Sequence, residues 1–177
     1  MSLHRLLEAL QNPARRRVFV SYHHANDQAY YDAFSKIFHG HYEAVYDNSL
    51  DRIIDSDNLE YVLRNIRENY ITGTSSTVVL CGSETAWRKF VDWEIKATLD
   101  RQHGLIGVWL PTNPLGPNGG VSKPDRLQDN IDSGYAVWTT WADLTQGPRR
   151  LQELVELGIS RPKNLIDNSR PLRKRNG

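Results

Sequence analysis

The sequence predicts an α/β domain whose core is a doubly wound parallel sheet of about five strands. Three observations predict this fold class: five short strand-like runs recur along the chain, helical patterns alternate with them, and the third and fourth runs are apolar without interruption. A parallel strand with apolar side chains on both faces must be covered on both faces, and helices in right-handed crossovers supply that cover. With 177 residues and 39% hydrophobic content, the chain has enough material for one such domain.

The N-terminal part alternates strand and helix twice after a short extension. Residues 1–16 carry leucines at helical spacing, which predicts an N-terminal helical extension. The next elements are expected in this order: a strand at VFVSY (18–22), a helix over about 28–38, a strand at EAVYD (43–47), a polar loop over 48–56 and a helix over 58–70.

The C-terminal part continues the alternation. The expected elements are a strand at STVVLCG (76–82), a helix after it, strands at LIGVWLP (105–111) and YAVWTTW (135–141), and a last helix over 148–158. Residues 112–133 are rich in Pro, Gly and Asn, which predicts a loop that is either a functional lid or a simple connection. Low apolar content after residue 159 predicts a mobile tail. We therefore divide the chain into an extension (1–16), a domain (17–159) and a tail (160–177).

Composition narrows the classes of partner. Lys and Arg number 22 against 21 acidic residues, so the net charge of +1 gives no general attraction to nucleic acid or to a membrane surface. The single Cys81 excludes an intrachain disulfide, and the chain opens without a secretory leader, so we expect a cytoplasmic protein. No run of about 18 apolar residues occurs, which is the length that a membrane-spanning helix needs. We therefore expect neither membrane nor nucleic-acid binding.

The segment SETAWRKFVDWEI (83–95) places a carboxylate where a helix would face the core. On a helical projection the apolar stripe is Trp87, Phe90, Val91, Ile95 and Thr98, and the charged side is Lys89, Asp92 and Lys96. Glu94 falls inside the apolar stripe, where an unpaired carboxylate costs on the order of several kcal/mol. Either a neighbouring Arg or backbone amide satisfies it, or it has a function. An unbroken helix from Thr85 would carry Glu94 away from the strand ends, so we predict a break and a new helix start near Arg88.

Small or polar residues follow the first three strands of the predicted sheet. They are Ser21, Tyr22 and His23 after the first strand, Asp47, Asn48 and Ser49 after the second, and Gly82 and Ser83 after the third. Ligands bind at the carboxyl ends of the strands in open α/β sheets, so we expect these side chains to converge there. Turns are polar in any protein, which remains the alternative for each single residue.

Several classes of site lack their signatures. No glycine-rich fingerprint follows the first strand, which disfavours dinucleotide-binding Rossmann enzymes and P-loop proteins. A phosphoryl receiver domain would need an Asp after the third strand, where this chain has Gly82 and Ser83. The histidines at 23–24 and 39–41 have no Cys or Glu at a metal-site spacing, so we expect no metal site.

Three motifs occur in order along the chain: VFVSYHHAND, VYDNSLD and VVLCGSETAWRKFVDWEI. Together they resemble a TIR domain, and more closely the TIR-like group that includes ThsB, the sensor subunit of the Thoeris anti-phage system. The resemblance covers about residues 17–140 and implies a flavodoxin-like fold. Many TIR domains have Trp-Cys-x-x-Glu where this chain has Phe-Val-Asp-Trp-Glu (90–94), and that departure follows the ThsB-like pattern.

The resemblance implies an enzyme that cleaves the nicotinamide glycosidic bond of NAD, with NAD as substrate, no separate cofactor, and Glu94 as the catalytic residue. It also implies a cyclic ADP-ribose-type product that activates a separate effector after phage infection, a phage component as trigger, and self-association through the loop at about 48–56. The residues that we expect to line the substrate pocket are Ser21, Tyr22, His23, Asp47, Ser49, Ser83 and Trp87. Tyr22, Trp87 and Trp93 are candidates for stacking on the rings of NAD.

Two other hypotheses remain open. A non-catalytic TIR scaffold would recruit protein partners through its surface loops. Pairing of Glu94 with Arg88 or another base, with no cavity beside it, would favour the scaffold. A receiver-like or nucleotide-binding relative would need a phosphate cradle, which the sequence does not contain.

Overall fold

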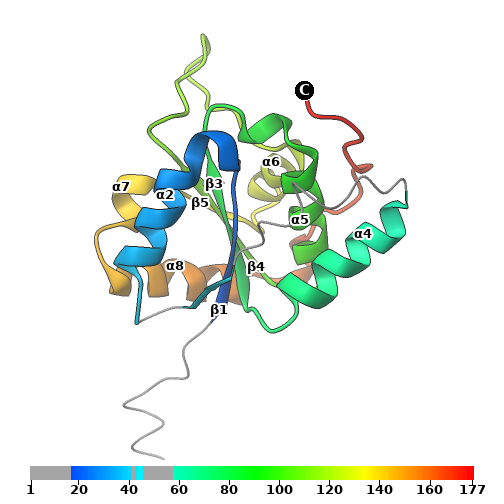
Figure 1. Ribbon diagram of the computed structural model, residues 1–177, viewed down its shortest axis with the longest axis horizontal. Helices are drawn as coiled ribbons and strands as arrows, with labels where there is room; N and C mark the ends of the chain where they lie inside the picture. The colour runs from blue at the N-terminus through cyan, green and yellow to red at the C-terminus, as the bar shows by residue number, and fades with distance from the viewer. Residues whose placement is uncertain (1–16, 41–42, 46–57) are drawn as a thin grey trace, which may run out of the picture.

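The computed structural model of the chain describes residues 17–40, 43–45 and 58–177 (Figure 1). A central sheet lies between two layers of helices (Figure 1). The predicted extension 1–16 and the predicted loop 48–56 lie outside the described residues. So do Asp47 and Ser49 of the expected site.

The described strands form one five-stranded, all-parallel sheet in the order β2-β1-β3-β4-β5, which confirms the predicted fold class. The strands are β1 (Arg17–Ser21), β2 (Glu43–Val45), β3 (Ser76–Cys81), β4 (Gly104–Trp109) and β5 (Val137–Thr140). β3 is buried along its whole length, as its uninterrupted apolar run predicts. From β1 the chain adds β2 on one side and β3, β4 and β5 on the other, so the topological switch point lies between β1 and β3.

Helices cover both faces of this sheet (Figure 1). One face carries α2 (His24–Ile37), α7 (Trp141–Leu144) and α8 (Pro148–Ser160), and the other carries α4 (Leu59–Asn65), the π-turn η1 (Ile66–Ile71), α5 (Lys89–Asp100) and α6 (Asp125–Asp132). Two short 3-10 turns are η2 (Thr85–Trp87) and η3 (Lys163–Leu165). Side chains alternate along a strand, so Val18 and Val20 pack with Phe34 of α2, whereas Phe19 packs with Val62 of α4.

A break precedes α5, as predicted. η2 ends at Trp87, Arg88 has extended backbone angles (φ −89°, ψ 119°), and α5 begins at Lys89. Glu94 therefore lies in the second turn of α5 rather than in the third turn of a longer helix. The break keeps this carboxylate close to the carboxyl ends of the strands.

Other expectations about local structure are wrong. Residues 112–133 are not one loop, because α6 occupies the last third of that segment. Two of the three buried residues of α6 are polar, Arg126 and Asn130, so its buried side has few apolar residues. α2 begins at His24 instead of near 28, and the helix expected over 58–70 changes to π winding at Ile66. α8 continues past the expected end at residue 158 to Ser160.

The two sides of α5 also differ from the helical projection. Asp92, expected on the charged outer side, is only 5% exposed because α6 covers that side, and its carboxylate pairs with Arg126 at 2.8 Å. Trp87, expected in the apolar stripe, is 43% exposed because it lies before the break. Charged residues of α5 thus lie in the interior, as Asp92 does, and are not confined to a solvent-facing side.

The segment after α8 lies against α5 and α6 through polar contacts, where we had expected a mobile tail. Arg126 donates to Oδ1 of Asn168 at 2.9 Å, and Arg126 also donates to the carbonyl of Pro171 at 3.2 Å. Asn130 donates to the carbonyl of Asp167 at 2.7 Å. A hydropathy pattern does not register contacts of this kind, which is why the segment has the composition of a free tail.

Asp27 of α2 lies directly against Gly82, the first residue after β3. A Cβ on Gly82 would lie 2.0 Å from Oδ2 of Asp27, so a larger residue does not fit there. Asp27 is fully buried, and Thr112 donates a hydrogen bond to its Oδ1 at 2.9 Å. Its Oδ2 has no hydrogen-bond partner among the described residues. Burial raises the pKa of this carboxyl.

Gly82→Ala is expected to lower the free energy of unfolding by roughly 1–3 kcal/mol, because the new Cβ displaces the buried side chain of Asp27. Gly120→Ala is the matched control, since nothing lies within 4 Å of its added Cβ. Chemical denaturation of the two variants measures the difference. Equal stability of both variants would contradict the close contact.

Asp27→Asn is expected to remove a pH dependence of stability. The pKa of Asp27 is higher in the folded than in the unfolded protein. Protonated Asp27 therefore contributes fully to the stability of the wild-type protein at low pH, and this contribution is lost as pH rises through the folded pKa. Asn does not ionise, so the melting temperature of the variant should rise relative to the wild type between about pH 3 and about pH 8. A constant difference across that range would show that Asp27 does not titrate in this way.

Candidate active site

The carboxyl ends of β1 and β3 bring several expected site residues to one edge of the sheet. Chain connections leave this switch point in opposite directions, which is the arrangement that opens a ligand crevice in α/β sheets. Ser21 is the last residue of β1, and α2 begins at His24 beside it. The loop after β3 begins at Gly82 and leads through η2 into α5.

Glu94 of α5 and Ser21 of β1 are in direct contact at this edge. The hydroxyl of Ser21 donates a hydrogen bond to Oε2 of Glu94. Both residues are buried, with 1% of Ser21 and 7% of Glu94 exposed. A hydrogen bond donated to a carboxylate stabilises its ionised form and fixes its orientation. The carboxylate can therefore lie within the apolar stripe, because the hydroxyl of Ser21 at the end of β1 is hydrogen-bonded to it.

A second polar contact anchors the same side of α5 one turn later. The hydroxyl of Thr98 donates to the backbone carbonyl of Glu94 at 2.8 Å, and it shares a 2.6 Å hydrogen bond with the hydroxyl of Thr77 in β3. All three residues are buried. α5 is therefore connected to β1 and to β3 on either side of the switch point, which limits how far Glu94 can move.

Glu84, which was not predicted from the sequence, contacts three polar side chains at the rim of this edge. Its Oε2 accepts hydrogen bonds from Arg88 at 2.5 Å and from Asn26 at 3.0 Å, and it lies 3.2 Å from Nε2 of His23. The hydrogen bond from Arg88 lowers the pKa of Glu84. Arg88, the base that the scaffold hypothesis pairs with Glu94, is thus paired with Glu84. Glu84 directly follows Ser83 in the loop after β3, and this position near a strand end was the signal that could have identified it.

Tyr22 lies on the other face of the sheet from Glu94, although it follows Ser21 in sequence. Its ring stacks on Tyr31 with the centroids 5.0 Å apart, and its hydroxyl donates to Gln28 at 2.8 Å. It belongs to the apolar cluster between the sheet and α2. Burial raises its pKa, so the phenol stays protonated at neutral pH. The Tyr22 ring thus packs against α2, while the residue stays close enough to Glu94 for a Coulombic interaction.

The remaining expected site residues divide between the rim and the interior. Ser83 is exposed in the loop after β3, and Trp87 is exposed at the end of η2. Trp93 is buried, and its Nε1 donates to the backbone carbonyl of Arg173 at 2.8 Å. Trp93 is thus a packing residue, and Trp87 has the more accessible ring.

Cys81 and the acidic side chains are further groups with chemical potential. Cys81 is fully buried, and burial raises the pKa of its thiol to about 12, which keeps it protonated and unsuited to attack as a thiolate. Within residues 17–40, 43–45 and 58–177, no three His, Cys, Asp or Glu side chains gather as metal ligands would.

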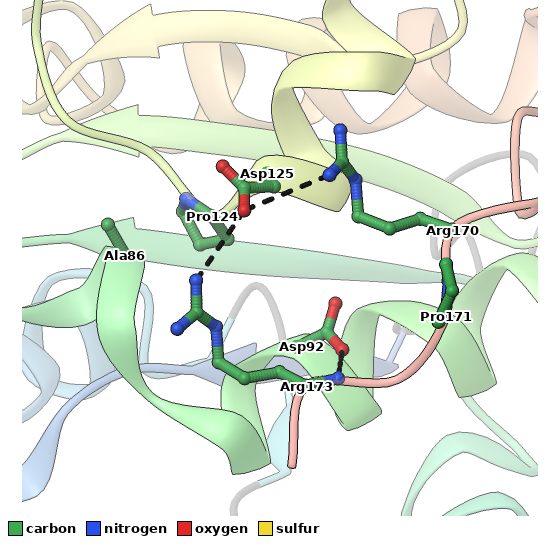
Figure 2. A pocket seen from close by; sticks show the side chains of 7 residues that line it. All are labelled: Ala86, Asp92, Pro124, Asp125, Arg170, Pro171 and Arg173. Atoms are coloured by element: carbon green, nitrogen blue, oxygen red, sulfur yellow. Dashed lines mark hydrogen bonds and ion pairs between the residues drawn. The ribbon is translucent and has the colours of Figure 1, made fainter. Parts of the chain in front are cut away.

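Two cavities formed by described residues lie away from Glu94. One, of about 340 Å³, runs along α2 beside Tyr31 and His39. The other, of about 230 Å³, lies between α5, α6 and the segment after α8 (Figure 2) and is lined by Ala86, Asp92, Pro124, Asp125, Arg170, Pro171 and Arg173. In Figure 2 the carboxylate of Asp125 stands between two guanidinium groups, 3.5 Å from that of Arg173 and 4.0 Å from that of Arg170.

Comparisons with known proteins identify the family of this chain. A search among curated proteins found no match. None of the helices in the described parts of the chain combines the length and the apolar character that crossing a bilayer requires. The profile of the family described as Thoeris protein ThsB, TIR-like domain, matches residues 19–114, which span β1 to the end of β4 and include Ser21 and Glu94. The chain therefore belongs to the ThsB TIR-like domain family of the Thoeris defence system.

Proposed function

We propose that this protein cleaves NAD between its ribose and its nicotinamide, with Glu94 as the catalytic residue. One observation carries the proposal: Glu94 is a buried carboxylate, hydrogen-bonded to Ser21 at the switch point of the sheet. Burying a carboxylate costs free energy, so its presence at the edge where ligands bind favours a chemical role over a structural one. Membership of the ThsB TIR-like family supports the class of reaction.

The chemistry requires a negative charge beside the ribose. The bond from C1 of the ribose to nicotinamide breaks with its electron pair on the nicotinamide nitrogen, so nicotinamide leaves as a neutral molecule. Positive charge develops on the ribose ring, and a carboxylate held in place beforehand lowers the free energy of that state. Glu94 supplies this charge and accepts hydrogen bonds from the ribose hydroxyls, while Ser21 keeps its carboxylate aligned.

The proposed product is a cyclic ADP-ribose-type nucleotide. A nucleophilic group of the same ADP-ribosyl molecule attacks C1 and gives up its proton, so the product is one water lighter than ADP-ribose. Exclusion of water from the site favours this closure over hydrolysis. Within Thoeris defence the nucleotide acts as a second messenger for a separate effector, and a phage component and self-association of the protein switch its production on.

Glu94→Gln is expected to reduce the rate of nicotinamide release by at least about a hundredfold, because it removes the negative charge that the transition state needs. The measurement is mass-resolved product analysis after incubation with NAD, both with purified protein and in phage-infected lysate. The wild-type protein should yield nicotinamide and a species one water lighter than ADP-ribose.

Glu153→Gln on α8 is the control, because Glu153 is exposed and its ion pairs with Arg149 and Arg150 lie at the surface. This variant should keep the wild-type rate. If NAD stays intact in infected lysate with the wild-type protein, or if Glu94→Gln works equally well, Glu94 has a structural role and the scaffold hypothesis takes its place.

Ser21→Ala is expected to lower kcat by about tenfold with little change in KM, because Glu94 loses the hydrogen bond that orients it. The control is Ser160→Ala, whose exposed hydroxyl donates to the carbonyl of Leu157 at the end of α8. Steady-state kinetics of nicotinamide release separates kcat from KM. A Ser21→Ala variant with unchanged kcat would show that Glu94 is aligned without Ser21.

A further inference from the structure

Residues 173–177, which we call the C-terminal clamp, form hydrogen bonds with the residues on both sides of the start of α5. Four hydrogen bonds connect them to residues 87–93: Arg173 N to Asp92 Oδ2 (2.8 Å), Trp93 Nε1 to Arg173 O (2.8 Å), Lys89 N to Asn176 Oδ1 (2.9 Å) and Gly177 N to Trp87 O (3.1 Å). This is the stretch of chain that ends directly before Glu94. The clamp therefore contacts both the break and the first turn of the helix that carries the candidate catalytic residue.

The clamp supplies α5 with a cap that its own sequence lacks. The first backbone N–H groups of a helix have no acceptor within the helix, and a side chain just before the helix normally provides one. The residue in that position is Arg88, and it makes no capping hydrogen bond. Instead, the N–H of Lys89 donates to the side chain of Asn176, which lies 87 residues later in the chain. Asn is among the best capping side chains, so the contact suits the role.

One residue of the clamp also holds the two residues that precede Glu94. The N–H of Arg173 donates to Asp92 (Figure 2), and the carbonyl of Arg173 accepts from Trp93. Asp92 and Trp93 are 5% and 4% exposed, so these hydrogen bonds are partly buried. A displacement of Arg173 would therefore move the backbone on which Glu94 stands.

We propose that the C-terminal clamp positions Glu94 against Ser21, with Asn176 and Arg173 as positioning residues for the reaction. The proposal rests on the proposed function for its effect on catalysis, whereas the effect on the Ser21 and Glu94 pair is independent of it. The four hydrogen bonds of the clamp reach residues 87–93, which precede Glu94. The clamp acts by fixing where α5 begins and how its first turn is oriented.

Asn176→Ala tests the clamp with a single exposed side chain, so the fold is expected to survive. Loss of the cap should speed hydrogen exchange at the Lys89 amide and lower kcat for nicotinamide release, each by about fivefold, with KM unchanged. The amide resonances of Ser21 and Glu94 should shift. Asn176→Asp should restore all of these properties, because Asp caps a helix as well as Asn. Lys174→Ala, a neighbouring exposed residue, is the matched control and should change none of them.

Trp93→Phe provides a second variant that keeps a ring in the core but removes the N–H that holds Arg173. It should shift the same two amide resonances and lower kcat. Unchanged exchange at Lys89 in Asn176→Ala, or unchanged resonances of Ser21 and Glu94 in both variants, would overturn the clamp. Faster exchange with an unchanged kcat would reduce it to a structural cap. If the wild-type protein does not cleave NAD, the proposed function fails, and the resonances still decide whether the clamp positions Glu94.

Discussion

The buried ion pair between Asp92 and Arg126 is the interaction on which the α5 side of the molecule depends. The guanidinium is fully buried and lies 2.8 Å from the carboxylate. Two buried charges recover their desolvation cost only if hydrogen bonds satisfy their remaining polar atoms, and removing one partner of such a pair costs about 3–5 kcal/mol. The segment after α8 supplies the partners: Arg126 donates to Oδ1 of Asn168 and to the carbonyl of Pro171, and the N–H of Arg173 donates to Asp92. The pair thus draws α5, α6 and the end of the described chain into one unit.

This unit explains why a helix with so many charged residues is interior on nearly every side. β1 and β3 contact α5 through Ser21 and Thr77, while Arg126 and the clamp contact it from the outer side. A helix held from opposite sides has little freedom to rotate or slide. Catalysis by a fixed charge needs such rigidity, because a carboxylate that must reorganise during the reaction loses much of its effect. The outer contacts therefore matter to the candidate site although they lie behind it.

The parts of the fold that were predictable from sequence are those whose signal is local. The uninterrupted apolar run at 76–82 indicated a covered strand, and the position of Glu94 within an apolar stripe indicated the break before α5 and a candidate site, which stays a prediction. Asp92 was assigned to the wrong side because its partner, Arg126, is 34 residues away and leaves no local pattern. α6 was missed because its buried side is largely polar, which leaves no apolar pattern in the local sequence. Asp27 meets Thr112, and Glu84 meets Asn26 of α2; both partners are distant in sequence, and only the folded chain brings them together.

The distance along the chain between Asp92 and Arg173 has a consequence for biosynthesis. The two residues are 81 positions apart, and the ribosome delivers them in order. A nascent chain can form the sheet and pair Asp92 with Arg126 well before the residues that complete their hydrogen bonds have emerged. Domains generally fold as they are made, N-terminal part first, so the contacts of Arg173 must wait until that residue is translated. The contacts around the start of α5 are therefore complete only after Arg173 has been synthesised, and shorter nascent chains carry Glu94 on a helix that these contacts do not yet hold.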